Sequence, residues 1–168
     1  MILVVAYNKN FAIAEDGEIP WYIPEDFKHF KETTDGGTVI MGRVTYDSLP
    51  DKFKPLPNRK NIVITRNPVA FMQTISEGSQ VGATQYLETA KRLSEITGEV
   101  DKTFVIGGSQ IYDLAFECGY VTKVIASEVE NDAKGDRFFP DLRSQGWKST
   151  IVKQFDQFKV VEFTPDAS

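Results

Sequence analysis

The sequence has few of the residues that build disulfides, metal sites and catalytic triads. It contains one cysteine, Cys118, and one histidine, His29. A single cysteine excludes an internal disulfide and a cysteine-based zinc site, so we expect Cys118 to be a partly buried free thiol in a reducing compartment. Because His29 has no ligand or triad partner at a suitable spacing, we expect it to be a surface residue, and we expect no metal site.

Long hydrophobic runs and an excess of positive charge are also absent. The longest apolar run, from Met1 to Tyr7, is far below the ~18 residues that span a bilayer, and no signal sequence precedes it. The 19 basic and 24 acidic side chains give a net charge of −5, which argues against a nucleic-acid partner. We therefore expect a cytoplasmic protein that binds neither membranes nor nucleic acids.

The composition is otherwise that of a globular domain, since 41% of the residues are hydrophobic and 26% are charged. The length of 168 residues is close to the ~150 of a typical domain. We therefore expect a single domain over residues 1–168. No segment marks an interface between subunits, so we expect a monomer.

Short apolar runs alternate along the chain with helical patterns, and continuous apolar runs are typical of strands buried on both faces. Strands are expected at residues 2–6, 38–41, 61–65, 103–106 and 123–127, with an antiparallel pair at 151–153 and 158–163. Helices are expected at residues 24–34, 44–49, 85–97 and 109–116. This order predicts a doubly wound α/β fold: a mainly parallel central sheet with an antiparallel C-terminal edge strand and helices on both faces. Ligands bind such sheets beyond the carboxyl ends of the strands.

The first expected helix carries a carboxylate close to its apolar side. At about 100° per residue, Ile23, Phe27 and Phe30 form an apolar stripe, and Asp26 lies about 40° from Phe30. Burial would raise the pKa of this carboxyl, as suits a proton donor near neutral pH, whereas the helix N-terminus would lower it. The indole N–H of nearby Trp21 needs a polar partner and favours a polar pocket. An acid that only stabilises the helix N-terminus is the alternative.

Two expected strands end in glycine turns that lead into helices. Gly42 with Arg43 forms the first turn, and Gly107 with Gly108 forms the second. Glycine lets a ligand approach the backbone closely, and free N–H groups at a helix start attract anions. Ordinary tight turns are the alternative. Arg43 and Arg66 both follow strand ends and favour a small polyanion, in which case the 2′-phosphate would select NADP over NAD.

Five motifs occur in order along the chain. They are Ile19-Pro20-Trp21 followed by Asp26, Phe30 and Thr34; Val39-Ile40-Met41-Gly42-Arg43 with Thr45; Leu56-Pro57-Asn58-Arg59-Lys60-Asn61; Val105-Ile106-Gly107-Gly108 with Ile111 and Tyr112; and Gly135-Asp136 with Phe139 and Pro140. On these motifs the chain resembles dihydrofolate reductase from Met1 to about Pro140. The resemblance implies reduction of 7,8-dihydrofolate to tetrahydrofolate with NADPH, with hydride delivered to C6. Asp26 would hold the pteridine and help to protonate N5, and Trp21 would position a water beside it.

The resemblance also implies two sets of binding residues. Those for dihydrofolate and folate analogues, with Arg59 on the α-carboxylate, are Val4, Val5, Phe27, Phe30, Thr34, Leu49, Leu56, Arg59 and Ile106. Those for NADPH are Ala6, Ile13, Ile19, Gly42, Arg43, Val44, Thr45, Thr65, Arg66, Gly107, Gly108, Ser109, Gln110, Ile111, Tyr112 and Ser127. A cis peptide bond is expected between the paired glycines.

The sequence departs from the family pattern at two positions, and two other functions are considered as alternatives. Ala14 stands where the family usually has a glycine in the mobile loop over the nicotinamide, and Ser127 stands where threonine is common. A pyrimidine reductase of riboflavin synthesis shares the fold, but it would not be expected to combine Trp21, Asp26 and Arg59. A non-catalytic nucleotide-binding module would keep the glycine turns and lose the inward acid.

Overall fold

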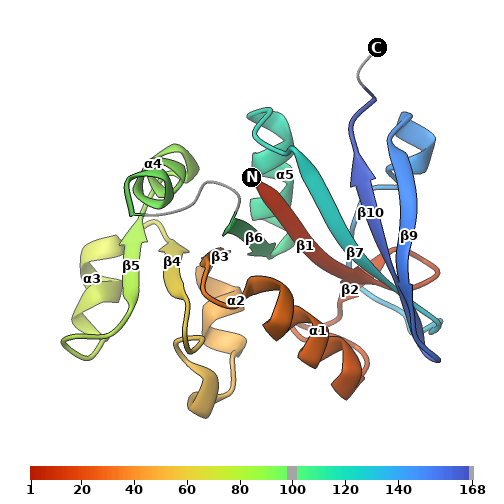
Figure 1. Ribbon diagram of the computed structural model, residues 1–168. Coiled ribbons are helices and arrows are strands. Elements are labelled where there is room, and N and C mark those ends of the chain that lie inside the picture. The colour runs from red at the N-terminus through yellow and green to blue at the C-terminus, as the bar shows by residue number, and fades with distance from the viewer. Residues whose placement is uncertain (98–101, 167–168) are drawn as a thin grey trace.

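The computed structural model describes residues 1–97 and 102–166, and strands alternate with helices through most of them (Figure 1). The strands are β1 (Ile2–Tyr7), β2 (Ala12–Ala14), β3 (Thr38–Gly42), β4 (Lys60–Ile64), β5 (Val81–Thr84), β6 (Thr103–Gly107), β7 (Lys123–Val129), β8 (Arg137–Phe138), β9 (Lys148–Gln154) and β10 (Phe158–Thr164). The helices are α1 (Pro24–Thr34), α2 (Arg43–Ser48), α3 (Pro68–Gln73), α4 (Leu87–Thr97) and α5 (Ser109–Glu117), with short 3-10 helices η1 (Asp51–Phe53) and η3 (Arg143–Gln145).

The main sheet has eight strands in the order β5-β4-β3-β6-β1-β7-β10-β9, from left to right in Figure 1. The six strands from β5 to β7 pair in parallel, and β10 is antiparallel to both β7 and β9. The predicted doubly wound, mainly parallel sheet is therefore confirmed. The C-terminal strand β10 is antiparallel as expected, but β9 forms the edge. The reason is burial, since Phe158 and Phe163 of β10 are buried whereas every residue of β9 is exposed.

Helices cover both faces of the sheet because side chains alternate along each strand. Leu3 and Val5 of β1 belong to a core cluster covered by α4 and α5. Val4 belongs to a cluster on the other face, with Tyr46 of α2 and Phe71 of α3. The motifs at the strand ends therefore rest on a two-sided core.

The sequence pattern predicts no element at β2, α3, β5 or β8. The helix α3 has six residues, with Pro68 in its first turn, and the Asn67 side chain caps it by accepting a hydrogen bond from the Ala70 N–H at 3.2 Å. This Asn-Pro pair is a helix-start signal that hydrophobic periodicity does not register. The strands β2, β5 and β8 have three, four and two residues, too few for an apolar pattern, so only their pairing defines them.

Residues 12–14 are held against a distant segment. β2 pairs antiparallel with β8, and the carboxylate of Asp136 accepts a hydrogen bond from the Asp16 N–H at 2.9 Å. A Cβ at Gly135 would lie 2.7 Å from the Ala12 Cβ and 2.8 Å from the Ala14 carbonyl oxygen, so only glycine fits there. Ala14 adopts a strand conformation in this pairing.

The expected environment of Cys118 is wrong. Its side chain is exposed because Cys118 is the C-cap of α5, beyond the buried residues Tyr112 and Ala115 of that helix.

Candidate active site

The two glycine turns lie side by side at the carboxyl ends of β3 and β6, which are parallel neighbours. A Cβ at Gly42 would lie 3.2 Å from the Ile111 Cγ1, and a Cβ at Gly107 would lie 3.4 Å from the Thr45 Oγ1. Gly107 has a φ of +131°, which favours glycine. The Gly107–Gly108 peptide bond is cis, as the resemblance implies. The starts of α2 and α5 therefore meet at one edge of the sheet.

Asp26 joins α1 to the centre of the sheet. Its Oδ1 accepts a hydrogen bond of 2.6 Å from the Ser127 hydroxyl of β7. Burial raises the pKa of the Asp26 carboxyl above its ordinary value, and the Ser127 hydrogen bond and the charge of His29 oppose the rise without cancelling it. A carboxyl that holds its proton to a higher pH is suited to proton transfer. The inward placement predicted from the helical pattern is therefore what the fold shows.

The expectation that His29 is a surface residue is wrong, because it is half-buried, with Nε2 3.4 Å from the Thr33 hydroxyl. The physical reason is its spacing: residues three apart share a side of a helix, and Asp26 already faces β7. Burial lowers the pKa of the His29 imidazole, while the nearby Asp26 charge raises it. His29, the single histidine of the sequence, is therefore a neighbour of Asp26.

Arg59 is a buried cation at the other end of α1. Only 5% of the surface of Arg59 is exposed. Nη1 donates to the Thr34 hydroxyl at 3.0 Å, Nε donates to the Pro57 carbonyl at 2.8 Å, and Cζ lies 5.9 Å from the centroid of the Phe30 ring. None of the ion pairs found in the described part of the chain involves Arg59. A buried guanidinium without a carboxylate partner is suited to bind one from a ligand.

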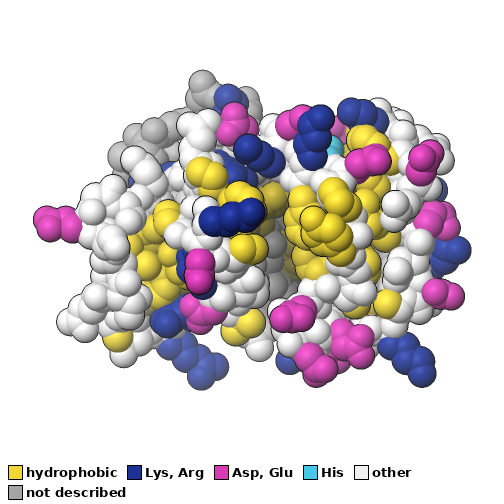
Figure 2. All heavy atoms as spheres, turned by 90° about the horizontal axis from the view of Figure 1, so that it is seen from below, with side chains coloured by type: hydrophobic (Ala, Val, Ile, Leu, Met, Phe, Trp, Pro, Cys, Tyr) yellow, Lys and Arg dark blue, Asp and Glu magenta, His cyan; other side chains and the backbone are white. Residues whose placement is uncertain are grey.

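Apolar side chains connect these two polar ends. Five residues expected to bind substrate meet in or against one core cluster: Val4, Phe30, Leu49, Leu56 and Ile106. Phe27 is 46% exposed and its ring packs on Tyr22 at 5.6 Å between centroids. Seen from the side of α1 and α2, hydrophobic side chains gather on both walls of a central groove (Figure 2). Phe30 lies between Asp26 and Thr34 on α1, so we take this apolar cluster and the two polar ends of α1 together as the candidate site.

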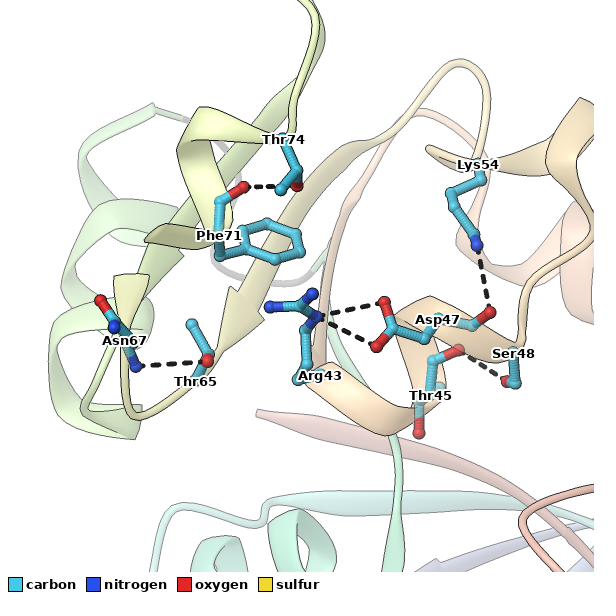
Figure 3. Close-up of polar contacts among 9 residues, drawn as sticks. All are labelled: Arg43, Thr45, Asp47, Ser48, Lys54, Thr65, Asn67, Phe71 and Thr74. Carbon is cyan, nitrogen blue, oxygen red and sulfur yellow. Dashed lines mark hydrogen bonds and ion pairs between the residues drawn. The ribbon is translucent and has the colours of Figure 1, made fainter. Parts of the chain in front are cut away.

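Arg43 is held in place at the start of α2 (Figure 3). Its Nε donates to both carboxylate oxygens of Asp47, at 3.1 and 3.0 Å, and its Cζ lies 4.8 Å above the Phe71 ring. In the view of Figure 3, Thr65 and Asn67 lie on the opposite side of Arg43 from Asp47. The sequence pattern missed Asp47 and Phe71, although an arginine and an acid four residues apart on a helix were a usable signal for the first.

Other expected residues are less closely joined. Trp21 packs against a separate cluster with Ile23, Val129 and Phe158, and no hydrogen bond links it to Asp26 in the described structure. The Val5 side chain lies on the opposite face of the sheet from Val4. The remaining expected residues divide by exposure: Ile19, Val44, Arg66 and Gln110 are exposed, whereas Ala6, Ile13 and Ser109 are half-buried.

Tyr112 links α5 to β1 beside the glycine turn. Its hydroxyl donates to the Val4 carbonyl oxygen at 2.7 Å, and burial raises the pKa of this phenol far above its ordinary value. A carbonyl oxygen accepts two hydrogen bonds. Tyr112 therefore occupies one acceptor position of the Val4 carbonyl.

The residues at the glycine turns fit a dinucleotide. The Thr45 hydroxyl lies close to both Gly107 and Gly108, since a Cβ added at either glycine would lie 3.4 or 3.5 Å from Thr45 Oγ1. Because neither glycine has a side chain, the hydroxyl faces the backbone directly. Arg43 adds a forked cation within the same region. Hydroxyls, close backbone and guanidinium are the groups that bind phosphates.

The structure is therefore that of an α/β protein with an apolar groove beside α1 and two glycine turns at the carboxyl ends of β3 and β6. A family model described as dihydrofolate reductase matches residues 1–164, so the chain belongs to the dihydrofolate reductase family. It is 34% identical over 151 residues to a dihydrofolate reductase of Bacillus subtilis, covering 90% of this chain and 82% of that protein.

Other proteins similar to this chain are dihydrofolate reductases as well. A dihydrofolate reductase of Neisseria meningitidis serogroup A is 38% identical over 146 residues, covering 87% of this chain and 82% of that protein. One of Heliothis virescens is 32% identical over 167 residues, covering 95% and 89%. The family expected from the motifs is confirmed, and neither the pyrimidine reductase nor the non-catalytic module is favoured. Among the described helices, none has the length and apolar character to cross a membrane.

Proposed function

We propose that this protein reduces 7,8-dihydrofolate to 5,6,7,8-tetrahydrofolate with NADPH. The proposal rests on one observation: Asp26 and Arg59 lie at opposite ends of α1, with apolar side chains between them. Asp26 and Thr34, which binds Arg59, are eight residues apart on α1, or about 12 Å along the helix axis. A pteridine joined to an aminobenzoyl group spans that length. Dihydrofolate therefore matches the groove in both size and charge.

The acid end of the groove binds and protonates the pteridine. Asp26 accepts hydrogen bonds from the pteridine amino group and N3–H, while the Ser127 hydroxyl holds its Oδ1. The pKa of the Asp26 carboxyl lies above its ordinary value because the group is buried, which favours transfer of a proton to N5, directly or through a water positioned by Trp21. The Val4 carbonyl, which also accepts the Tyr112 hydrogen bond, binds an amino group of the same ring. Phe27 and Phe30 bind the apolar middle of the substrate, and Arg59 binds its α-carboxylate.

The glycine-lined edge binds the cofactor. NADPH supplies a hydride to the substrate when it is bound. Gly42, Thr45 and the Gly107–Gly108 pair contact its phosphates, and Arg43 with Thr65 and Arg66 contacts the adenosine 2′-phosphate. Ala6, Ile13, Ile19 and Ser127 border the nicotinamide. We further propose that the chain acts as a single-domain cytoplasmic monomer, without nucleic-acid or membrane partners.

The test of this function is the rate of NADPH oxidation by purified protein with and without dihydrofolate. We expect oxidation to require dihydrofolate and to yield tetrahydrofolate in equal amount. Equal rates in the two reactions would refute the proposal. Arg59→Leu tests the substrate end separately, because loss of the carboxylate partner should raise the dihydrofolate Kd by at least about tenfold while leaving the NADPH Kd unchanged. Equal losses for both ligands would reject the role of Arg59.

A further inference from the structure

The Arg43–Asp47 pair has an unusual form for a surface ion pair. Both carboxylate oxygens of Asp47 accept from Nε, at 3.1 and 3.0 Å, so the ion pair occupies one edge of the guanidinium. The two terminal amino groups make no hydrogen bond among those found in the described chain. In the view of Figure 3 Nε faces Asp47, and Thr65 and Asn67 lie on the opposite side of Arg43.

Phe71 fixes the plane of the same guanidinium. Cζ of Arg43 lies 4.8 Å above its ring, and Phe71 itself is 1% exposed. The ring is held edge-on by Tyr46 at 5.2 Å between centroids. A buried ring that packs against α2 cannot follow the guanidinium, so it acts as a fixed support for it.

Asp47 is anchored at its backbone as well. Its carbonyl oxygen accepts a hydrogen bond of 3.0 Å from Lys54 Nζ, and the Ser48 hydroxyl donates to the Thr45 carbonyl at 2.7 Å. These contacts hold the end of the short helix α2 that carries the carboxylate. Arg43 is thus constrained on its Nε edge by Asp47 and on one face by Phe71, while its two terminal amino groups take part in neither contact.

We propose that Asp47 and Phe71 are positioning residues that direct the two amino groups of Arg43 toward the 2′-phosphate of the cofactor and thereby set the preference for NADPH over NADH. This inference rests on the cofactor site in the proposed function. A pre-oriented arginine loses less side-chain entropy when it binds a phosphate. The preference then depends on two residues that do not contact the phosphate themselves.

Asp47 also has an opposing effect, because its negative charge lies near the expected phosphate. Asparagine separates the two effects. In Asp47→Asn the amide oxygen still accepts from Nε but the charge is gone, whereas in Asp47→Ala both are lost. Positioning predicts that alanine weakens recognition of the 2′-phosphate and asparagine does not. Repulsion predicts that both substitutions strengthen it.

The experiment compares the binding of adenosine 2′,5′-bisphosphate with that of adenosine 5′-monophosphate by calorimetry, since the ratio of their affinities isolates the 2′-phosphate. Ordering one long side chain is worth about 1 kcal/mol, so Asp47→Ala should lower this ratio about fivefold. Asp47→Asn should stay within about twofold of the original protein, and Phe71→Leu should lower the ratio as Asp47→Ala does. In steady-state kinetics Asp47→Ala should raise the KM for NADPH while kcat and the KM for NADH stay unchanged.

Glu88→Ala is the matched control, because Glu88 forms an exposed pair with Arg92 at the same spacing of four residues on α4, at 2.9 Å. It should leave the affinity ratio unchanged. An unchanged or raised ratio in Asp47→Ala, or an equal fall in Asp47→Asn, would overturn the positioning role. If Arg43→Ala lowers the affinity ratio while Asp47→Ala leaves it unchanged, the inference alone fails. If Arg43→Ala leaves the ratio unchanged, the proposed cofactor site fails as well.

Discussion

Asp26 shows how neighbours set the chemistry of one side chain. Its position in the first turn of α1 favours the carboxylate through the helix dipole, whereas burial favours the protonated acid. Burial outweighs the opposing contacts, so the pKa rises. The same residue on the solvent side of α1 would be an ordinary surface acid.

Replacing Asp26 with asparagine should remove the proton donor and keep the shape of the site. We expect Asp26→Asn to reduce turnover about 100-fold at pH 7, with partial recovery at low pH, where free substrate is already protonated. Steady-state rates between pH 5 and pH 9 measure this. Because a raised pKa disfavours the folded state once the carboxyl is ionised, the substitution should also raise the unfolding free energy at pH 7. Unchanged turnover at pH 7 would contradict the role of Asp26.

The pH dependence of the reaction rate should reveal the electrostatic interaction between Asp26 and His29. Protonated His29 lowers the pKa of Asp26, so His29→Gln should raise that pKa and move the decline of the rate with pH to higher pH. The single histidine also gives one imidazole signal in NMR. Burial lowers its pKa, Asp26 and Glu32 raise it, and Lys153 lowers it. Asp26→Asn should therefore lower the pKa of His29 further, and Lys153→Gln should raise it. If the pKa of His29 is the same in both variants as in the original protein, the electrostatic interaction is refuted.

At the scale of the element, α1 organises the site and the β2–β8 pair orders the segment beside it. One face of α1 holds the acid at one end and the partner of Arg59 at the other. β2 carries Ile13, which we expect at the nicotinamide, and its pairing with β8 requires a glycine at position 135. A short strand packed this closely against a glycine responds strongly to a single added methyl group.

Gly135→Ala should therefore disturb β2. The added Cβ would lie 2.7 Å from the Ala12 Cβ, and overpacking of this kind costs about 1–3 kcal/mol of unfolding free energy. We expect this loss in chemical denaturation together with a higher KM for NADPH. Gly82→Ala is the control, because a Cβ there meets nothing within 4 Å. Equal stability of the two variants would exclude a tight contact at Gly135.

At the scale of the whole molecule, Glu128 ties together four parts of the chain. It accepts hydrogen bonds from Tyr7 of β1 at 2.6 Å and from both terminal nitrogens of Arg143 at 2.6 and 3.0 Å, and it lies 3.7 Å from Lys159 of β10. Burial raises the pKa of Glu128, but these hydrogen bonds and charges outweigh burial and lower it overall. The network is therefore stabilising while Glu128 is ionised.

This network predicts the acid sensitivity of the fold. A carboxyl with a lowered folded-state pKa adds stability that is present above its unfolded pKa and is lost as the pH falls through the folded pKa. Glu128→Gln should lower the unfolding free energy by about 2 kcal/mol at pH 7. The difference should shrink on acidification, as urea unfolding at pH 7 and below pH 4 would measure. A difference that is constant with pH would show that the charge of Glu128 is not the cause.

Local patterns predicted the parts of the site that lie on single elements. The 3.6-residue period placed Asp26 beside the apolar side of α1, and strand-glycine-helix order located both turns. His29 was misplaced, because its burial depends on what packs against α1. Asp47 and Phe71 were missed, the second because α3 is too short to have a periodic pattern.

The sequence by itself determined the alternation of strands and helices, the inward acid and the family, because these depend on residue spacing within single segments. Only the tertiary structure decided which segments meet. Ser127 reaches Asp26 across 101 residues and Tyr112 reaches Val4 across 108. The tertiary structure also buries Arg59 beside Thr34, and no ion pair to Arg59 is found among residues 1–97 and 102–166. The physical reason is that periodicity specifies which face of an element is buried, whereas strand order specifies which buried faces become neighbours.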